Sequence, residues 1–198
     1  MGITSKKHEV GAYQDAAKLH CALIAEGFLT TLGVPFLTLL YRSIDQDNGS
    51  AFLVEKVNGE VVGFVTGASG LGRIYRRLLL QPHRLFFALR GCLFSPLKIY
   101  RILEILMFSI RKKDTVQLPS EELLSIVVSK NCQGNGSAER LFRSLCNHFA
   151  SKGADSFKIV VGGNLDRAHA FYQKMGCVPC VELQVHRGSN SIVYIKHL

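Results

Sequence analysis

The loop at 133–138, with the sequence Gln-Gly-Asn-Gly-Ser-Ala, carries residue types that bind phosphate. It follows the mostly apolar run 123–128, which predicts a central buried strand, and precedes an amphipathic helical pattern at 136–152. A strand, a glycine-rich loop and a helix start together make an anion site, because free backbone N–H groups and the helix dipole point outward there. Gly134 and Gly136 allow the backbone to approach a phosphate closely. The sequence therefore predicts a pyrophosphate site at this loop.

Two common phosphate-binding loops do not fit these residues. The P-loop of kinases and GTPases needs Gly-Lys-Ser/Thr, and a dinucleotide fingerprint needs a third spaced glycine; the loop has neither. The side chains of Gln133 and Ser137 can add hydrogen bonds to a phosphate. Taken alone, the loop also fits a helix that merely begins on glycines.

A second pattern follows the next expected strand, at 157–161. Asn164 comes soon after this strand, a short helix at 166–175 carries Phe-Tyr with Tyr172 as its second member, and Gly176 precedes the final strands.

In this order the two patterns resemble the GNAT superfamily of acetyltransferases. The loop pattern of that family, Gln/Arg-x-x-Gly-x-Gly/Ala, is matched by Gln133, Gly136 and Ala138. The resemblance covers about 15–196, apart from an insert at about 67–115. Each motif alone is weak, and their specificity comes from their order and from the elements that carry them.

The resemblance implies transfer of an acetyl or short acyl group from acetyl-CoA, or another acyl-CoA, to a primary amine by direct attack. The residues that it implies for co-substrate binding are Ile126, Val127, Val128, Gln133, Gly134, Asn135, Gly136, Ser137, Ala138, Asn164 and Tyr172. The strand backbone would pair with the pantetheine arm like an added strand, and the loop amides would hold the pyrophosphate. Tyr172 would protonate the leaving thiolate, and a backbone N–H on 127–128 would stabilise the oxyanion. The alternative for Tyr172 is a helix residue that only packs on the sheet.

The amine must lose a proton, and Glu121 and Glu122 at the start of the central strand are the candidate bases, directly or through water. Only one can face the cleft, because neighbouring strand residues point to opposite faces, and we favour Glu122. The alternative for both is a solvated strand end. The seven histidines do not form a ligand spacing such as His-x-x-x-His, so no metal is expected.

Apolar spacing and turn residues predict the remaining elements. These are a weak first strand ending near Val10, a helix from an Asp15 N-cap to Gly33, a second helix at 36–44, strands at 51–57 and 60–66, and final strands near 178–185 and 191–196. Asn58-Gly59 is the strongest hairpin signal, because both central residues of a type I′ turn need positive φ. With the resemblance, this predicts an α/β fold: a single GNAT-like domain over 1–198, with a mixed, mostly antiparallel sheet that is splayed at the cofactor site and flanked by helices.

The insert at 67–115 combines apolar and basic residues. It contains ten Lys and Arg against two acidic residues, so it carries +8 of the net charge of +9. Pro82 and Pro96 divide it into about three expected helices, and no stretch of about 18 apolar residues is free of charge, so none is expected to span a bilayer.

The position of the insert in the GNAT layout implies that it lies beside the acceptor groove. Its charge suggests a small-molecule acceptor that carries phosphate, such as a nucleotide-linked or lipid-linked amino sugar, with the insert resting in the second case on an anionic membrane. Acidic protein or nucleic acid is a further alternative, although no RNA-binding motif is found. The simplest alternative is a helical cover with solvated charges.

Met1 to Gln14 is polar and lacks the apolar core of a signal peptide, and the six cysteines are scattered. Reduced thiols and a cytoplasmic location, with peripheral membrane contact as an option, are therefore expected. Cys177 and Cys180 have redox spacing, but they do not open a helix. The alternative to an enzyme is a non-catalytic acyl-CoA sensor or a membrane-surface interaction module. The oligomeric state, the acyl chain length and the acceptor stay open.

Overall fold

A computed structural model describes residues 2–4, 10–24, 28–92, 118–186 and 189–198 of the chain. Within these residues, seven strands form one sheet: β1 (Gly2–Thr4), β2 (Ala51–Val57), β3 (Glu60–Ser69), β4 (Glu121–Val128), β5 (Ser156–Gly162), β6 (Val178–His186) and β7 (Ser189–His197). Their order is β1-β2-β3-β4-β5-β7-β6, and every neighbouring pair is antiparallel except β4–β5. This confirms the predicted mixed α/β fold with a mostly antiparallel sheet.

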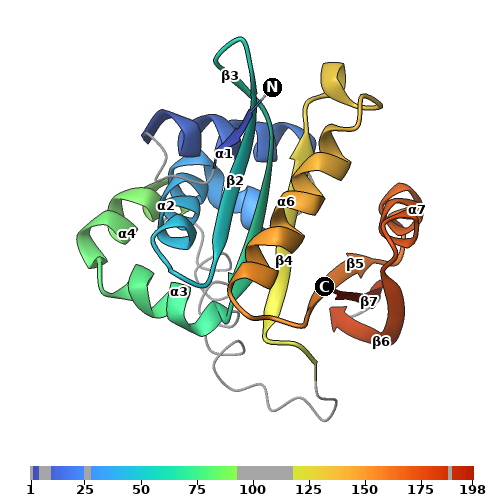
Figure 1. The fold of residues 1–198 in the computed structure, drawn as a ribbon. Coiled ribbons are helices and arrows are strands. Elements are labelled where there is room, and N and C mark those ends of the chain that lie inside the picture. The colour runs from blue at the N-terminus through green and yellow to red at the C-terminus, as the bar shows by residue number, and fades with distance from the viewer. Residues whose placement is uncertain (1, 5–9, 25–27, 93–117, 187–188) are drawn as a thin grey trace.

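Helices cover both faces of the sheet, and each face has its own apolar core. The α-helices of the described residues are α1 (Val10–Leu23), α2 (Gly33–Asp45), α3 (Leu71–Leu79), α4 (Pro82–Leu89), α6 (Ser137–Ser151) and α7 (Asp166–Lys174). Figure 1 shows α6 crossing one face of β2–β4 while α1 and α2 lie behind the other. On the α1–α2 side, Tyr41, Phe52 and Phe64 are buried together; on the α6 side, Phe142 and Phe149 are buried. The sheet is thus enclosed along β2–β4, where the glycine loop departs.

The β2–β3 hairpin is the part of the fold that local residues fix most directly. Asn58 and Gly59 both have positive φ, 52° and 86°, as the type I′ turn requires. In β3, a register shift lies beside Gly63, and a Cβ at Gly63 would come within 3.0 Å of the Val127 carbonyl oxygen. The predicted hairpin is confirmed, and Gly63 is a position where a bulge and a close approach of two backbones coincide.

The first helix starts earlier than the sequence pattern predicts. α1 begins at Val10, so Asp15 is an exposed mid-helix residue, 3.3 Å from Lys18, and not an N-cap. Tertiary packing extends the helix, because the Tyr13 ring is buried against Phe52 and its hydroxyl donates to Asp45 at 2.6 Å. The predicted stop at Gly33 is also wrong: α1 ends at Leu23, and Gly33 opens α2.

The insert is described only in its first part. β3 runs past the predicted end, to Ser69, and is followed by α3 and α4, with Pro82 at the first turn of α4 as expected for a residue that breaks one helix and opens the next. A 3-10 turn at Arg90–Cys92 follows, and the predicted division at Pro96 lies outside the described residues. Among the helices that are described, none has the length and apolar character needed to cross a bilayer.

Candidate active site

The β4–β5 pair opens where the co-substrate is expected. β5 pairs with β4 at two positions only, Glu122 with Lys158 and Leu123 with Ile159. Beyond Leu123, the described part of the chain gives β4 strand pairing on its β3 side alone. Ile126, Val127 and Val128 therefore line an edge on which an extended ligand can lie as an added strand. The splay is the feature that the resemblance implies, and the structure shows it.

A β-bulge lies at the same point of β4. Thr66 of β3 is opposite Ser125, but the next residue, Gly67, is opposite Leu123, so Leu124 is the extra residue. A bulge bends its strand and redirects the backbone groups beside it. The bulge thus coincides with the opening between β4 and β5, and nothing in the sequence pattern signals it.

The predicted phosphate loop lies between β4 and α6. Gly134 and Gly136 have φ of 82° and 81°, in the left-handed region, and Gly136 is the N-cap of α6. A helix of 15 residues therefore begins directly after a glycine turn, which presents backbone N–H groups at the positive end of the helix dipole. The glycines are where the backbone conformation requires them.

The side chains of Gln133 and Ser137 form hydrogen bonds within the protein that brace the loop, and their contact with a phosphate stays a prediction. Gln133 donates to the Val128 carbonyl at 3.0 Å, and the Ser137 hydroxyl donates to the Asn135 side-chain oxygen at 2.7 Å. The same Asn135 oxygen accepts from the Ser137 backbone N–H at 3.2 Å, and Ser137 is buried. These side-chain hydrogen bonds fix the shape of the loop, whose backbone N–H groups at the helix start are the expected donors to a phosphate.

Arg140 and Glu55 hold this loop to the sheet, and sequence reasoning missed both. Nη2 and Nε of Arg140 lie 2.5 and 3.1 Å from Oε1 of Glu55, which is fully buried in β2. The same guanidinium donates to the Asn135 carbonyl and the Ser137 hydroxyl, each at 3.0 Å. A charged residue inside the apolar run of β2 was the available signal, because a buried carboxylate requires a partner.

Tyr172 lies in α7 and is buried among aromatic side chains. Its ring centroid lies 6.1 Å from that of Phe142, 5.3 Å from Phe171 and 6.3 Å from Tyr194. Burial, with a smaller effect of Cys177, raises the pKa of Tyr172 above its usual value, so the phenol keeps its proton at neutral pH. Asn164 is exposed in the turn between β5 and α7. Both residues therefore come from the segment that follows β5, the strand that diverges from β4.

The two glutamates at the start of β4 have different surroundings. Glu121 accepts from Ser69 at 2.9 Å and from Ser120 at 2.8 Å. Burial opposes ionisation of Glu121, but these hydrogen bonds and Lys158 together bring its pKa below the usual value. Glu122 lies 3.9 Å from Lys158 Nζ and is half-buried. Both stand at the paired end of β4–β5, and Glu122 is two residues before the bulge.

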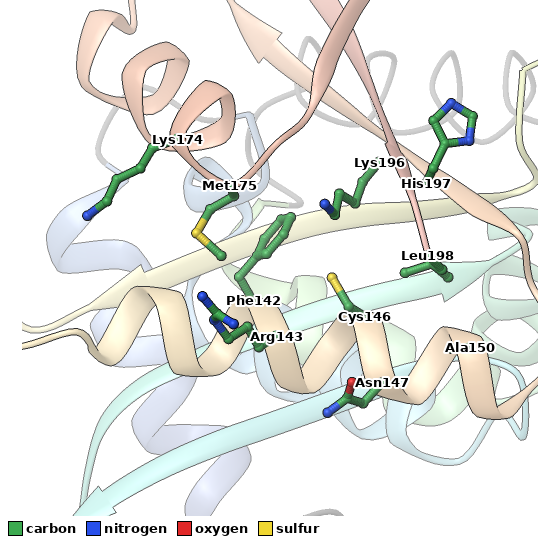
Figure 2. Close-up of a pocket in the computed structure, with 10 residues that line it drawn as sticks. All are labelled: Phe142, Arg143, Cys146, Asn147, Ala150, Lys174, Met175, Lys196, His197 and Leu198. Atoms are coloured by element: carbon green, nitrogen blue, oxygen red, sulfur yellow. The ribbon is translucent and has the colours of Figure 1, made fainter.

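A groove of about 480 Å³ lies on the same side of the sheet, but elsewhere (Figure 2). It runs along the second half of α6, the end of α7 and the end of β7, with the cations Arg143, Lys174 and Lys196 around it. None of the residues predicted to bind the co-substrate lines it. The groove is therefore distinct from the glycine loop and the open edge of β4.

Neither a metal centre nor a redox pair is indicated within the described residues. No group of three or more His, Cys, Asp or Glu there could hold a metal ion. Cys177 is buried, and burial raises the pKa of its thiol to about 11, which keeps it protonated and unreactive at neutral pH. Cys180 is an exposed free thiol. Cys177 therefore lacks the lowered pKa that a reactive cysteine of a redox pair has.

Solved structures share this fold across nearly the whole chain. A ribosomal-protein-alanine N-acetyltransferase from Brucella melitensis superposes with a TM-score of 0.65, at 13% identity and with 100% of each chain covered. An N-acetyltransferase from Staphylococcus aureus Mu50 gives 0.63, at 14% identity and 99% and 97% coverage. An aminoglycoside 6'-N-acetyltransferase in complex with coenzyme A gives 0.59, at 14% identity and 100% and 97% coverage. At these identities the likeness shows the fold.

The family is shown by the sequence itself. A search among curated proteins finds no significant match. The family model described as acetyltransferase (GNAT) family matches residues 22–177, which include the open strand, the glycine loop and the Tyr172 helix. The chain therefore belongs to the GNAT acetyltransferase family, whose members are acyl-CoA-dependent N-acetyltransferases.

Proposed function

We propose that this protein moves an acetyl or short acyl group from acyl-CoA to a primary amine on an anionic small molecule, such as a nucleotide-linked or lipid-linked amino sugar. The observation that carries the acyl-CoA part is the open edge of β4, which leads directly into a loop with two left-handed glycines and a helix start. A pantetheine arm suits the edge and a pyrophosphate suits the helix start.

The chemistry then follows from positioning. The amine nitrogen attacks the thioester carbonyl, a C–N bond forms, and the C–S bond breaks as the tetrahedral intermediate collapses. Glu122, directly or through water, takes the proton that the amine loses, and Tyr172 gives its proton to the departing thiolate. The raised pKa of Tyr172 suits this role, because the phenol holds its proton until the thiolate forms beside it. A backbone N–H at 127–128 stabilises the oxyanion.

The anionic acceptor is supported by charge. Residues 71–92 contain five arginines and no acidic residue, and they lie in α3, α4 and the turn that follows. A field of one sign raises the local concentration of a phosphate-bearing acceptor and lowers that of cationic amines.

Calorimetry with acetyl-CoA tests the loop, and α6 provides a matched pair of glycines. Gly136 and Gly153 flank the helix with φ of 81° and 80°, so alanine is strained to a similar degree at both. A Cβ at Gly136 would lie 3.1 Å from Arg140 Nη1, whereas a Cβ at Gly153 has no neighbour within 4 Å. We expect Gly136→Ala to weaken acetyl-CoA binding at least about tenfold, and Gly153→Ala to leave it unchanged.

Two outcomes would contradict the proposal. If the wild type does not bind acetyl-CoA, the proposed co-substrate site does not exist. If Gly136→Ala and Gly153→Ala bind acetyl-CoA with equal affinity, the loop is not part of that site. An assay of thiol release against a panel of neutral, cationic and phosphate-bearing amines then separates enzyme from sensor. Binding without turnover on any amine would favour the non-catalytic alternative.

A further inference from the structure

The α3–α4 helices expose large apolar side chains beside arginines. Leu79, Leu80, Phe86 and Phe87 are 50%, 73%, 58% and 64% exposed. These four side chains, together with the exposed Arg76, Arg84 and Arg90, form what we call the α3–α4 surface. The Phe86 and Phe87 ring centroids are 6.1 Å apart, and α4, which carries them, contacts α3. Large exposed apolar side chains on two contacting helices indicate a binding surface, because isolated exposed residues are common but clusters are not.

The packing of the two helices fixes this surface on the outside. α3 buries Ile74, Tyr75 and Leu78 against the α1–α2 core, so the residues that follow at its end point away. α4 has no fully buried side chain, and it rests on the same core through Leu85 and other half-buried residues. In the described fold, one side of each helix therefore packs on the core, while Phe86 and Phe87 are exposed.

The arginines divide into two groups. Arg73 lies 3.5 Å from Asp47, and Arg77 donates to the Gln46 carbonyl at 2.6 Å, so both brace α3 against the end of α2. Arg76, Arg84 and Arg90 are exposed, and no acidic residue occurs anywhere in 71–92. Within 71–92, the charge that accompanies the apolar side chains is thus entirely positive.

A hollow of about 430 Å³ adjoins this surface between α1, α2 and α4. Phe87 lines it together with three arginines, Arg42, Arg84 and Arg90, and with Thr38. Guanidinium groups bind phosphate oxygens in a bidentate manner, and Thr38 adds a hydroxyl, although that hydroxyl also donates to the Val34 carbonyl at 2.7 Å. The hollow has the charge and size to receive a phosphate headgroup.

We propose that the α3–α4 surface docks the protein on an anionic lipid bilayer, with Phe86, Phe87, Leu79 and Leu80 in the interface and the arginines on lipid phosphates. Leucines and phenylalanines enter the headgroup–acyl boundary, and arginines next to them attract anionic lipids. Exposed leucines distinguish this surface from a nucleic-acid site, where bases stack on aromatic rings. The inference goes beyond the transfer reaction and does not depend on it, although docking would bring a lipid-linked acceptor within reach.

Co-sedimentation with vesicles tests the proposal. Wild-type protein should sediment with phosphatidylcholine vesicles that contain phosphatidylglycerol, more weakly at high salt, and much less with phosphatidylcholine alone. Each arginine near an anionic surface contributes about fivefold to the partition coefficient, so Arg84→Glu/Arg90→Glu should lower it at least about 25-fold. Lys18→Glu/Lys152→Glu, which makes the same charge change at exposed sites on α1 and after α6, should lower it far less.

The apolar part is tested by Phe86→Ser/Phe87→Ser, which should lose most binding while it keeps its circular dichroism spectrum. Val160→Ser/Val178→Ser, at exposed apolar positions of β5 and β6, is the control. Acetyl-CoA calorimetry on the same variants reports the co-substrate site separately, so failure of docking and failure of the proposed reaction are distinguishable.

Three results would overturn the proposal. The first is no sedimentation of the wild type with anionic vesicles at low salt. The second is equal sedimentation of the wild type and the Phe86→Ser/Phe87→Ser variant. The third is salt-dependent binding to single-stranded RNA that is lost in that variant while vesicle binding is unchanged, which would assign the surface to nucleic acid.

Discussion

Acidification should destabilise this protein through His20. The imidazole is 2% exposed, its Nδ1 lies 2.5 Å from the Tyr41 hydroxyl oxygen, and its ring stacks on Phe64 at 6.4 Å. Nε2 is buried and has no hydrogen-bond partner among the described residues. Burial lowers the pKa of His20 from 6.5 to about 4, because a charged ring would lose its hydration there.

The sign of the effect follows from proton binding. Between pH 6.5 and 4 the unfolded chain binds a proton at His20 that the folded protein does not, so the free energy of unfolding falls as pH falls. The pKa of His20 in the unfolded chain and its pKa in the folded protein differ by about 2.5. The loss of unfolding free energy therefore reaches a limit of about 3 kcal/mol below pH 4. Between pH 7 and pH 5 the loss is about 2 kcal/mol. Burial also lowers the pKa of His148, which adds to the loss in the same direction.

Urea unfolding at pH 7 and pH 5, followed by circular dichroism because the chain has no tryptophan, measures the effect. Between pH 7 and pH 5, the free energy of unfolding of His20→Gln should fall by about 2 kcal/mol less than that of the wild type. This difference does not depend on the stability of the variant at pH 7. His83→Gln, at an exposed position of α4, should behave like the wild type. If the wild type and His20→Gln lose the same free energy, His20 is not the buried neutral group that the packing implies.

Two further substitutions test the candidate site. Tyr172→Phe should lower the chemical step by about 100-fold or more, the usual contribution of a general acid, while acetyl-CoA affinity measured by calorimetry stays within about twofold. Glu55→Gln should lower the free energy of unfolding by about 2 kcal/mol, because it breaks a buried pair whose arginine is 38% exposed and keeps part of its hydration. The same variant should weaken acetyl-CoA binding, since Arg140 loses the anchor from which it holds the loop.

Each of these has its own check. Unchanged turnover of Tyr172→Phe under chemistry-limited conditions would leave the tyrosine with a packing role only. For Glu55→Gln, the control is Glu60→Gln, at an exposed position where β3 begins. Wild-type acetyl-CoA affinity in Glu55→Gln would show that the loop keeps its shape without the pair.

Local chemistry was sufficient to predict several elements. Asn58-Gly59 predicts the hairpin because few residues accept positive φ, and the turn has that geometry. Gly136 and Gly153 delimit α6 for the same reason, both with left-handed φ. The glycine loop and the Tyr172 helix are contiguous motifs, so the family followed from the sequence, and the family model confirms it.

Contacts between distant segments decided the rest, because no local pattern encodes them. The start of α1 at Val10 depends on Tyr13 packing on β2, which overrides the N-cap propensity of Asp15. Gln133 donates to the Val128 carbonyl and Ser137 to the Asn135 side chain, contacts that exist only once the loop has folded. The buried partner of Glu55 lies 85 residues along the chain, which sequence spacing does not reveal.

The opening of β4 away from β5 is likewise tertiary. Both strands are apolar enough to pair along their length, and the sequence determined that they exist and in which order they come. Only the folded sheet shows pairing at two positions followed by divergence at a bulge on Leu124. The physical reason is that register and splay depend on what β3 and β7 do on either side, whereas a strand's own residues fix its alternation and its burial.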